Sequence, residues 1–431
     1  MKRFGLTYLG LMAICLAIFL CLSACRQPTI NTNPSSPPEH SRDFTNQNSI
    51  LNRSNPPVQT ISGNILMWYD FSINLEDAQR TIRTYKELNP NVNIVIEKIP
   101  GEELIKRFFQ QFQAGLAPNL LLMDYDFLFQ LISAKTLISF DPEAIDLSNT
   151  LPSALAQVTY HHKIYGLPAV ILTQVLCYNK NKVNSNNLLK NLDDLVSQAV
   201  KGFSIGIPSS FEKTFWGIQL FGSQVFDAQG NFVLKRGSWA AWMTWLQSIK
   251  NQPNIILSSS FNALNQSFAK GNLDYLVCDS ASIPEFRKAL KGNLGITTLP
   301  SHGENLAGPI LSTKVLAITN SFSPRQTAIA LDFARFITNK EQQKQRAMDL
   351  NAFLIPNKTV ILDKRLFPTQ AILEQQARSA VGIPLNHIPK AEIVFPIAES
   401  LYEQILTGAI SPQEGGIELL KLVHQSSQKT Q

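Results

Sequence analysis

Short apolar runs alternate with amphipathic segments from residue 64 onward. The runs at 64–69, 92–96 and 120–123 predict buried strands, because each is shorter than a helix and ends at polar or turn-forming residues. Between the first two runs, Leu75, Ala78 and Ile82 recur at helical spacing, and between the last two, Leu104 and Phe108 lie one helical turn apart. Both spacings predict amphipathic helices. The order strand–helix–strand–helix–strand is typical of a mainly parallel sheet that is covered by helices.

The N-terminal segment 1–24 has the pattern of a secretory signal. Two cations precede an apolar run at 4–22, and small residues follow it. Residues 22–25 read Leu-Ser-Ala-Cys, which resembles the lipobox of bacterial lipoproteins, in which the cysteine is lipidated and becomes the new N-terminus. We therefore expect lipidation of Cys25 and an exported protein anchored to a membrane on its periplasmic or cell-surface side. An uncleaved transmembrane anchor and ordinary secretion are the alternatives.

The segment 26–60 is rich in Asn, Pro, Ser and Thr and has little apolar content. Such a segment cannot bury enough surface to order itself, so 25–60 is predicted to be a lipidated cysteine followed by a disordered tether. The folded body that follows, from about 61 to 424, is longer than one core usually covers, and two lobes are expected.

Composition argues against nucleic-acid binding and leaves open whether the remaining cysteines are oxidised. The net charge of +6 is scattered, without a dense Lys/Arg run, so nucleic-acid binding is not expected. Once Cys15 and Cys21 leave with the signal and Cys25 carries lipid, Cys177 and Cys278 remain. Buried free thiols are favoured for this pair. A single disulfide stays open, because the spacing cannot decide it.

Several segments resemble the maltose-binding-protein-like, family 1 solute-binding proteins of ABC importers. Residues 163–168 read Lys-Ile-Tyr-Gly-Leu-Pro and 178–180 read Tyr-Asn-Lys, both similar to motifs of that family. Residues 114–119 resemble its A-x-G-x-P-D pattern, with Asn119 in place of the usual Asp. The resemblance covers nearly all of 61–424.

This resemblance implies an α/β, two-lobed periplasmic-binding-protein-like fold, in which each lobe is a mainly parallel sheet flanked by helices and a hinge joins the lobes. The expected lobes are 61–170 with 306–350, and 171–305 with 351–431. The implied function is capture of a small solute, with a carbohydrate as the first expectation, and its delivery to an ABC permease. A monomer without enzymatic activity, cofactor or metal is expected.

The candidate ligand-binding residues follow predicted strands, because loops at the carboxyl ends of strands line the crevice of open α/β sheets. Carboxylates match sugar hydroxyls, and aromatic rings match apolar sugar faces. In the first lobe the candidates are Trp68, Tyr69, Asp70, Asp124, Tyr125 and Asp126. Packing of the aromatic residues in the core, with the acids as helix caps, is the alternative.

For the second lobe, the resemblance suggests a further set of contacts: Thr173, Gln174, Phe215, Trp216, Asp279, Ser280 and Gly308. Many relatives carry Gly-x-Trp after the strand where this chain has Asp279 and Ser280. The missing Trp indicates a ligand that is smaller or more polar than a typical oligosaccharide.

Two other functions need consideration. Residues 202–206 fit G-x-S-x-G, which would make Ser204 the nucleophile of a membrane-anchored hydrolase. That motif needs a helix directly after the serine, whereas an extended apolar run that ends at Pro208 follows here. A sensor module that uses the same fold without transport has the same sequence features as a receptor.

Overall fold

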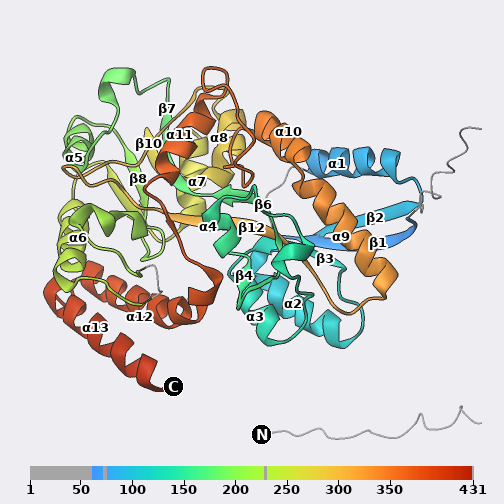
Figure 1. Ribbon diagram of the computed structural model, residues 1–431. Coiled ribbons are helices and arrows are strands. Elements are labelled where there is room, and N and C mark those ends of the chain that lie inside the picture. The colour runs from blue at the N-terminus through green and yellow to red at the C-terminus, as the bar shows by residue number, and fades with distance from the viewer. Residues whose placement is uncertain (1–60, 71–74, 228–230, 430–431) are drawn as a thin grey trace, which may run out of the picture. The chain divides into compact units, whose positions relative to one another are not determined.

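The computed structural model describes residues 61–70, 75–227 and 231–429. These residues all belong to one unit, shown in Figure 1. Cys25, the signal segment and the tether lie outside the described residues. In the part of the chain that is described, no helix is both long and apolar enough to cross a membrane.

The first sheet has six strands, in the order β13-β12-β3-β1-β2, with β6 also paired to β12. β1 is parallel to β2 and β3, whereas β12 is antiparallel to β3 and β6. The predicted strand–helix–strand–helix–strand unit is confirmed, as β1 to β3 with two helices between them. The strands are β1 Gly63–Tyr69, β2 Val92–Lys98, β3 Leu120–Asp124, β6 Leu167–Leu172, β12 Ile310–Ile318 and β13 Val381–Gly382.

Helices cover both faces of the first sheet, because its strands are buried on both sides (Figure 1). On one face Tyr85 of α1 and Phe333 of α9 pack together, with ring centroids 4.9 Å apart. On the other face Leu104 and Phe108 of α2 and Leu128 of α3 are fully buried. The helices are α1 Leu75–Leu88, α2 Gly101–Gln113, α3 Phe127–Ser133, α9 Pro324–Thr338 and α10 Lys340–Leu350. Between α3 and β6 the chain also forms a short helix, α4 Pro152–Ala156, and a hairpin of β4 Thr159–Tyr160 and β5 Lys163–Ile164.

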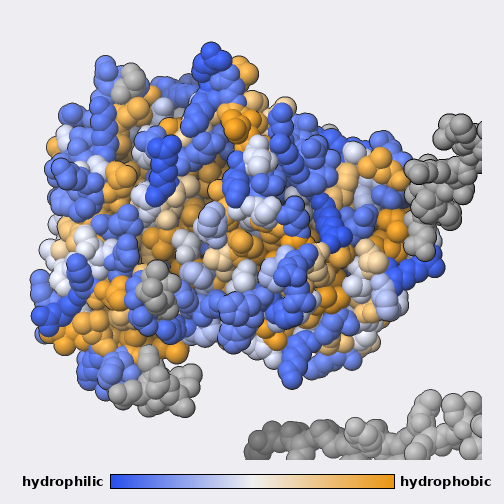
Figure 2. All heavy atoms as spheres, in the orientation of Figure 1, coloured by the Kyte–Doolittle hydropathy of each residue, from blue (hydrophilic) through white to orange (hydrophobic). Residues whose placement is uncertain are grey.

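The second sheet has the order β11-β7-β10-β8-β9 and mixes parallel and antiparallel pairs. One core joins it to α5, α6, α12 and α13, and another joins it to α7, α8 and α11. The elements are β7 Gln174–Asn179, β8 Ile205–Pro208, β9 Ile255–Ser258, β10 Tyr275–Asp279, β11 Leu294–Thr297, α5 Leu192–Val200, α6 Arg236–Ile249, α7 Phe261–Ala269, α8 Ile283–Ala289, α11 Pro368–Ala377, α12 Ile388–Thr407 and α13 Pro412–Lys429. Figure 2 shows hydrophilic residues spread among apolar ones over the visible face of the molecule.

The chain passes between the sheets at Thr173, the one residue between β6 and β7. It returns between β11 and β12. The predicted lobe ranges stay a prediction, and one strand departs from them: β13 lies within the range assigned to the second lobe but pairs with β12 in the first sheet.

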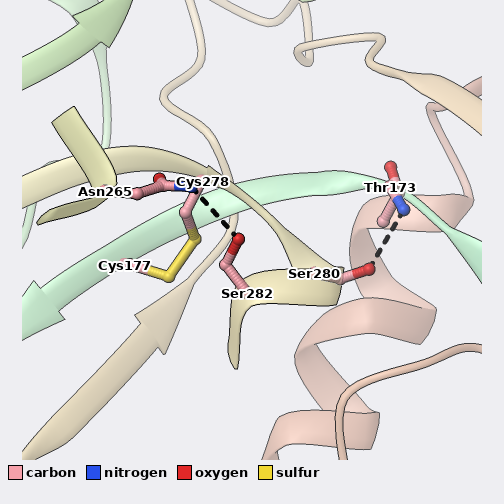
Figure 3. The surroundings of a disulfide bond; sticks show 6 residues. All are labelled: Thr173, Cys177, Asn265, Cys278, Ser280 and Ser282. Carbon is pink, nitrogen blue, oxygen red and sulfur yellow. Dashed lines mark hydrogen bonds between the residues drawn. A yellow bond between two sulfur atoms is a disulfide. The ribbon is translucent and has the colours of Figure 1, made fainter. Parts of the chain in front are cut away.

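Cys177 and Cys278 form a disulfide between β7 and β10 (Figure 3). The antiparallel register places Cys177 opposite Leu276 and Cys278 opposite Val175, so the two cysteines are diagonal neighbours with Cα atoms 5.9 Å apart. Both are fully buried. The expectation of free thiols is therefore wrong. The sequence separation of 101 residues carries no information about the register that brings them together.

The disulfide closes a long loop, so its loss should destabilise the protein. Replacing both residues, as Cys177→Ala with Cys278→Ala, should lower the free energy of unfolding by about 2–4 kcal/mol in urea titrations. A reductant should destabilise the unmodified protein and leave the double variant unchanged. Two free thiols in the denatured, unreduced protein would contradict this assignment.

Candidate functional site

A cavity of about 330 Å³ lies where the two sheets meet. Its described lining comes from both sheets and is mostly polar: Asp70, Asp124, Asp126, Leu172, Thr173, Gln174, Glu212, Lys213, Asp279, Ala281, Ile310, Ser312 and Lys314. Six of the predicted site residues are in this set.

The β6–β7 crossing contributes part of the lining. Strand register places Ser312 of β12 opposite Leu172, and Asp279 of β10 opposite Gln174. Thr173 joins these two pairs and is held by Ser280, whose N–H donates to the Thr173 carbonyl at 2.9 Å. In return the Thr173 N–H donates to Ser280 Oγ at 3.3 Å (Figure 3). Ser280 is fully buried, so it positions the crossing and does not line the cavity.

On the first-sheet side, Lys314 is held between two acids. Lys314 of β12 lies opposite Asp124 of β3, and its Nζ is 2.7 Å from Asp124 Oδ2. The same Nζ is 3.1 Å from Asp70 Oδ1, at the end of the neighbouring strand β1. The Lys314 and Asp70 side chains are only 8% and 3% exposed. A buried charge is tolerated when it is paired, and the register supplies the partners here.

The pKa shifts of this group follow from two acids sharing one cation. Burial works against the charged form of Lys314, but Asp124 and Asp70 outweigh it, and the pKa of Lys314 is raised. Burial raises the pKa of Asp70. Attraction to Lys314 lowers this pKa, but repulsion from Asp124 offsets part of that effect, so the pKa stays raised. The group keeps one surplus negative charge.

On the second-sheet side, Lys213 likewise lies between two acids. Its Nζ lies 3.2 Å from Asp279 Oδ2 and 3.4 Å from Glu212 Oε1. Attraction to Asp279 raises the pKa of Lys213 despite its partial burial. Gln174 Nε2 donates to the Lys213 carbonyl at 3.0 Å, which ties this segment to the crossing.

Asp126 caps α3, where its Oδ1 accepts the Phe127 N–H at 3.0 Å. The Asp126 side chain is exposed to water, but it lies in the lining of the cavity, where protein atoms surround it. Reduced solvation is the main cause that raises the pKa of Asp126 to about 7, and repulsion from Asp124 and Glu212 adds to it. The acids of the two walls therefore act on one another across the cavity.

The predicted aromatic contacts of the first lobe lie in its cores. Alternate side chains of a strand point to opposite faces, so Trp68 packs on the α2 side and Tyr69 on the α1 side. Trp68 is 2% exposed, with the Arg107 guanidinium 4.9 Å from its ring centroid. Tyr125 is also buried. This arrangement supports the core alternative for all three residues.

In the second lobe, Phe215 and Trp216 are buried in the core that contains α6. Trp216 packs edge-on against Trp242, with ring centroids 5.0 Å apart. Gly308 is likewise outside the cavity lining, and a Cβ there would collide with the Gln219 side chain. The absence of a side chain at Gly308 makes room for Gln219.

Sequence reasoning missed Glu212, Lys213, Ser312 and Lys314. A signal existed for Lys314, which is the one charge in the apolar strand Ile-Leu-Ser-Thr-Lys-Val-Leu-Ala-Ile and so requires a buried partner. For the other three residues the sequence shows no comparable pattern.

Ser204 does not have the setting of a hydrolase nucleophile. It directly precedes β8, whereas a nucleophile elbow follows a strand and opens a helix. Its hydroxyl donates to Asp274 Oδ2 at 3.0 Å, and its N–H donates to the same oxygen at 2.8 Å. Ser204 therefore tethers the start of β8 to the start of β10.

The model of the bacterial extracellular solute-binding protein family matches residues 80–371. The chain belongs to this family. The protein is therefore exported, as the sequence predicts.

Two curated relatives and a solved structure show how far the similarity extends. The galactooligosaccharide-binding protein of Bacillus subtilis (strain 168) is 21% identical over 358 residues, covering 76% of this chain and 81% of the relative. A maltodextrin-binding protein of the same strain is 23% identical over 376 residues, covering 80% and 88%. The maltose-bound MalE3 of T. maritima matches with a TM-score of 0.73 at 19% identity, covering 84% of this chain and 99% of that one. The match to this solved structure confirms the predicted two-lobed fold.

In this solute-binding protein, removing the Lys314 charge should be costly. Lys314→Met leaves the buried Asp70 without its cation and should lower the free energy of unfolding by about 3–5 kcal/mol. Lys163→Met is a suitable control, because it breaks an exposed pair with Asp141 and should cost less than about 1 kcal/mol.

Adding Asp70→Asn to Lys314→Met should restore part of the lost stability, since the uncompensated carboxylate is then neutral. Equal unfolding midpoints for Lys314→Met and Lys163→Met in urea would show that the buried group does not depend on its cation.

Proposed function

We propose that this protein is the substrate-binding component of an ABC importer, which captures a carbohydrate in the cavity between its sheets and delivers it to a membrane permease. The observation that carries the proposal is the polar cavity at the β6–β7 crossing, with lining residues from both sheets. Carboxylate and amide groups suit a ligand that is rich in hydroxyl groups. The names of the two curated relatives, which bind galactooligosaccharide and maltodextrin, support the ligand class.

Capture follows from where the polar groups lie. Asp70, Asp124 and Asp126 belong to the first wall, and Asp279 lies on the second. A ligand that contacts both walls stabilises the closed state by the difference between its affinities for the closed and open states. Hinge closure of this kind is known for periplasmic binding proteins. In this proposal the short passage at Thr173 acts as part of the hinge, and Gln174, which lines the cavity, contacts the ligand.

The protein acts as a monomer that binds and releases its ligand without chemical change. Lipid on Cys25 keeps it beside its permease, and the segment up to residue 60 serves as a tether. Stable anchoring needs more than one acyl chain, which lipidation of a lipoprotein cysteine would supply.

Carbohydrate binding can be measured by calorimetry with maltodextrins and galactooligosaccharides. Saturable binding is expected, and the ligand should be recovered unchanged. Ala281→Trp should abolish binding, because Ala281 lines the cavity and the indole would fill part of it. Ala144→Trp, on the exposed surface beside the first sheet, is the matched control. No binding of any sugar, or equal binding by both variants, would overturn the proposal.

Anchoring can be tested in cells by labelling with radioactive palmitate. The unmodified chain should incorporate label and sediment with membranes, whereas Cys25→Ser should do neither, because the acceptor thiol is missing. Cys15→Ser, which changes a thiol within the signal segment, should keep the label. Label that persists in Cys25→Ser would rule out this lipidation site.

A further inference from the structure

The described lining of the cavity has a surplus of negative charge. Five carboxylates, those of Asp70, Asp124, Asp126, Glu212 and Asp279, face two ammonium groups, those of Lys213 and Lys314. With all of them ionised, three negative charges remain uncompensated.

This surplus is distributed over the cavity. Lys314 is shared between Asp70 and Asp124, and Lys213 is shared between Glu212 and Asp279, so each group retains one negative charge. The third charge is that of Asp126. No lysine or arginine among the described residues forms an ion pair with it, and its Oδ1 accepts only the N–H of its own helix.

Burial raises the pKa of Asp126, and Asp124 and Glu212, which belong to the same set of acids, raise it further. These acids are also not arranged as a metal centre. In the described part of the chain, no group of three or more Asp, Glu, His or Cys side chains is placed to hold a metal ion.

The lining has hydrogen-bonding capacity without stacking surfaces. None of the described lining residues is aromatic. Thr173 is 3% exposed, and its hydroxyl has no hydrogen-bond partner among the described residues. Figure 3 shows this hydroxyl turned away from Ser280, which engages the backbone of Thr173. A buried hydroxyl without a partner calls for an explanation, and a ligand bound against this wall would provide one.

We propose that the ligand is a carbohydrate that carries a protonated amino group, with the ammonium placed between Asp126 and Glu212. This inference rests on the proposed function and specifies its substrate class. An ammonium group donates to carboxylates through charge-assisted hydrogen bonds, which are stronger than neutral ones. The same surplus disfavours phosphorylated, sulfated and uronic-acid sugars. The hydroxyl groups of the ligand are left to the Lys213 and Lys314 groups, Gln174 and Thr173.

Matched sugars that differ at one substituent test the proposal. Calorimetry would compare α- and β-1,4-linked disaccharides of glucosamine with their N-acetylated forms and with maltose and cellobiose. An amino form should bind at least about tenfold tighter than its neutral counterparts, the scale of a hydrogen bond to a charged group. Its affinity should also fall as salt is added.

Neutral sugars that bind as tightly as amino sugars would overturn this inference and leave the proposed function standing. If no sugar of any form binds, or if spermidine binds and sugars do not, both fall.

Variants locate the ammonium. Asp126→Asn keeps an oxygen for capping α3 and removes the charge, and Glu212→Gln does the same on the opposite wall. Each should lower the ratio of amino-sugar to neutral-sugar affinity about tenfold. Asp193→Asn removes an equal charge from the exposed surface of α5 and should leave the ratio unchanged. An unchanged ratio in both cavity variants would contradict the placement.

Discussion

One nearly continuous strand serves both sheets, and the site depends on this constraint. β6 ends at Leu172 and β7 begins at Gln174, so a single residue separates two pairing registers. The first register fixes Ser312 beside Leu172, and the second fixes Asp279 beside Gln174. Ser280 hydrogen-bonds the backbone of Thr173 between them and so ties that residue to the second sheet. The disulfide of β7 and β10 lies a few residues beyond the crossing, so the second sheet is covalently fixed near its contribution to the cavity.

The first-sheet wall is rigid for a different reason. Lys314 of β12 lies opposite Val170 of β6, just before the crossing. It is buried in a strand that pairs with neighbours on both of its edges. A buried ammonium requires its acids to stay in place, so Asp70 and Asp124 are held at fixed positions even without a ligand. The acids predicted from the ends of β1 and β3 therefore have a structural partner as well as a place at the cavity.

The sequence indicated the elements well and the direction of side chains poorly. Apolar runs and helical periodicity were sufficient for β1 to β3 and their helices, because both are local properties. The strand-end rule placed Asp70, Asp124 and Asp126 correctly at the cavity. The same rule failed to bring Trp68 and Tyr125 there, since which face of a strand is covered by helices is not a local property. The Cys177–Cys278 pair and the partners of Lys314 depend on the register of strands far apart in sequence, which no spacing reveals.

If the two walls close on a ligand as proposed, their charges act on that closure. The first wall carries Asp70, Asp124 and Asp126 against Lys314, and the second carries Glu212 and Asp279 against Lys213, so both walls are net negative. Bringing two like-charged walls together in a partly dehydrated cavity raises the energy of the closed state. The raised pKa of Asp126, to which Glu212 contributes after burial and Asp124, agrees with repulsion between the walls. A cationic ligand removes this repulsion as it bridges the walls, whereas a neutral one must overcome it through hydrogen bonds alone. The charges that we propose to select the ligand would then also keep the empty receptor open.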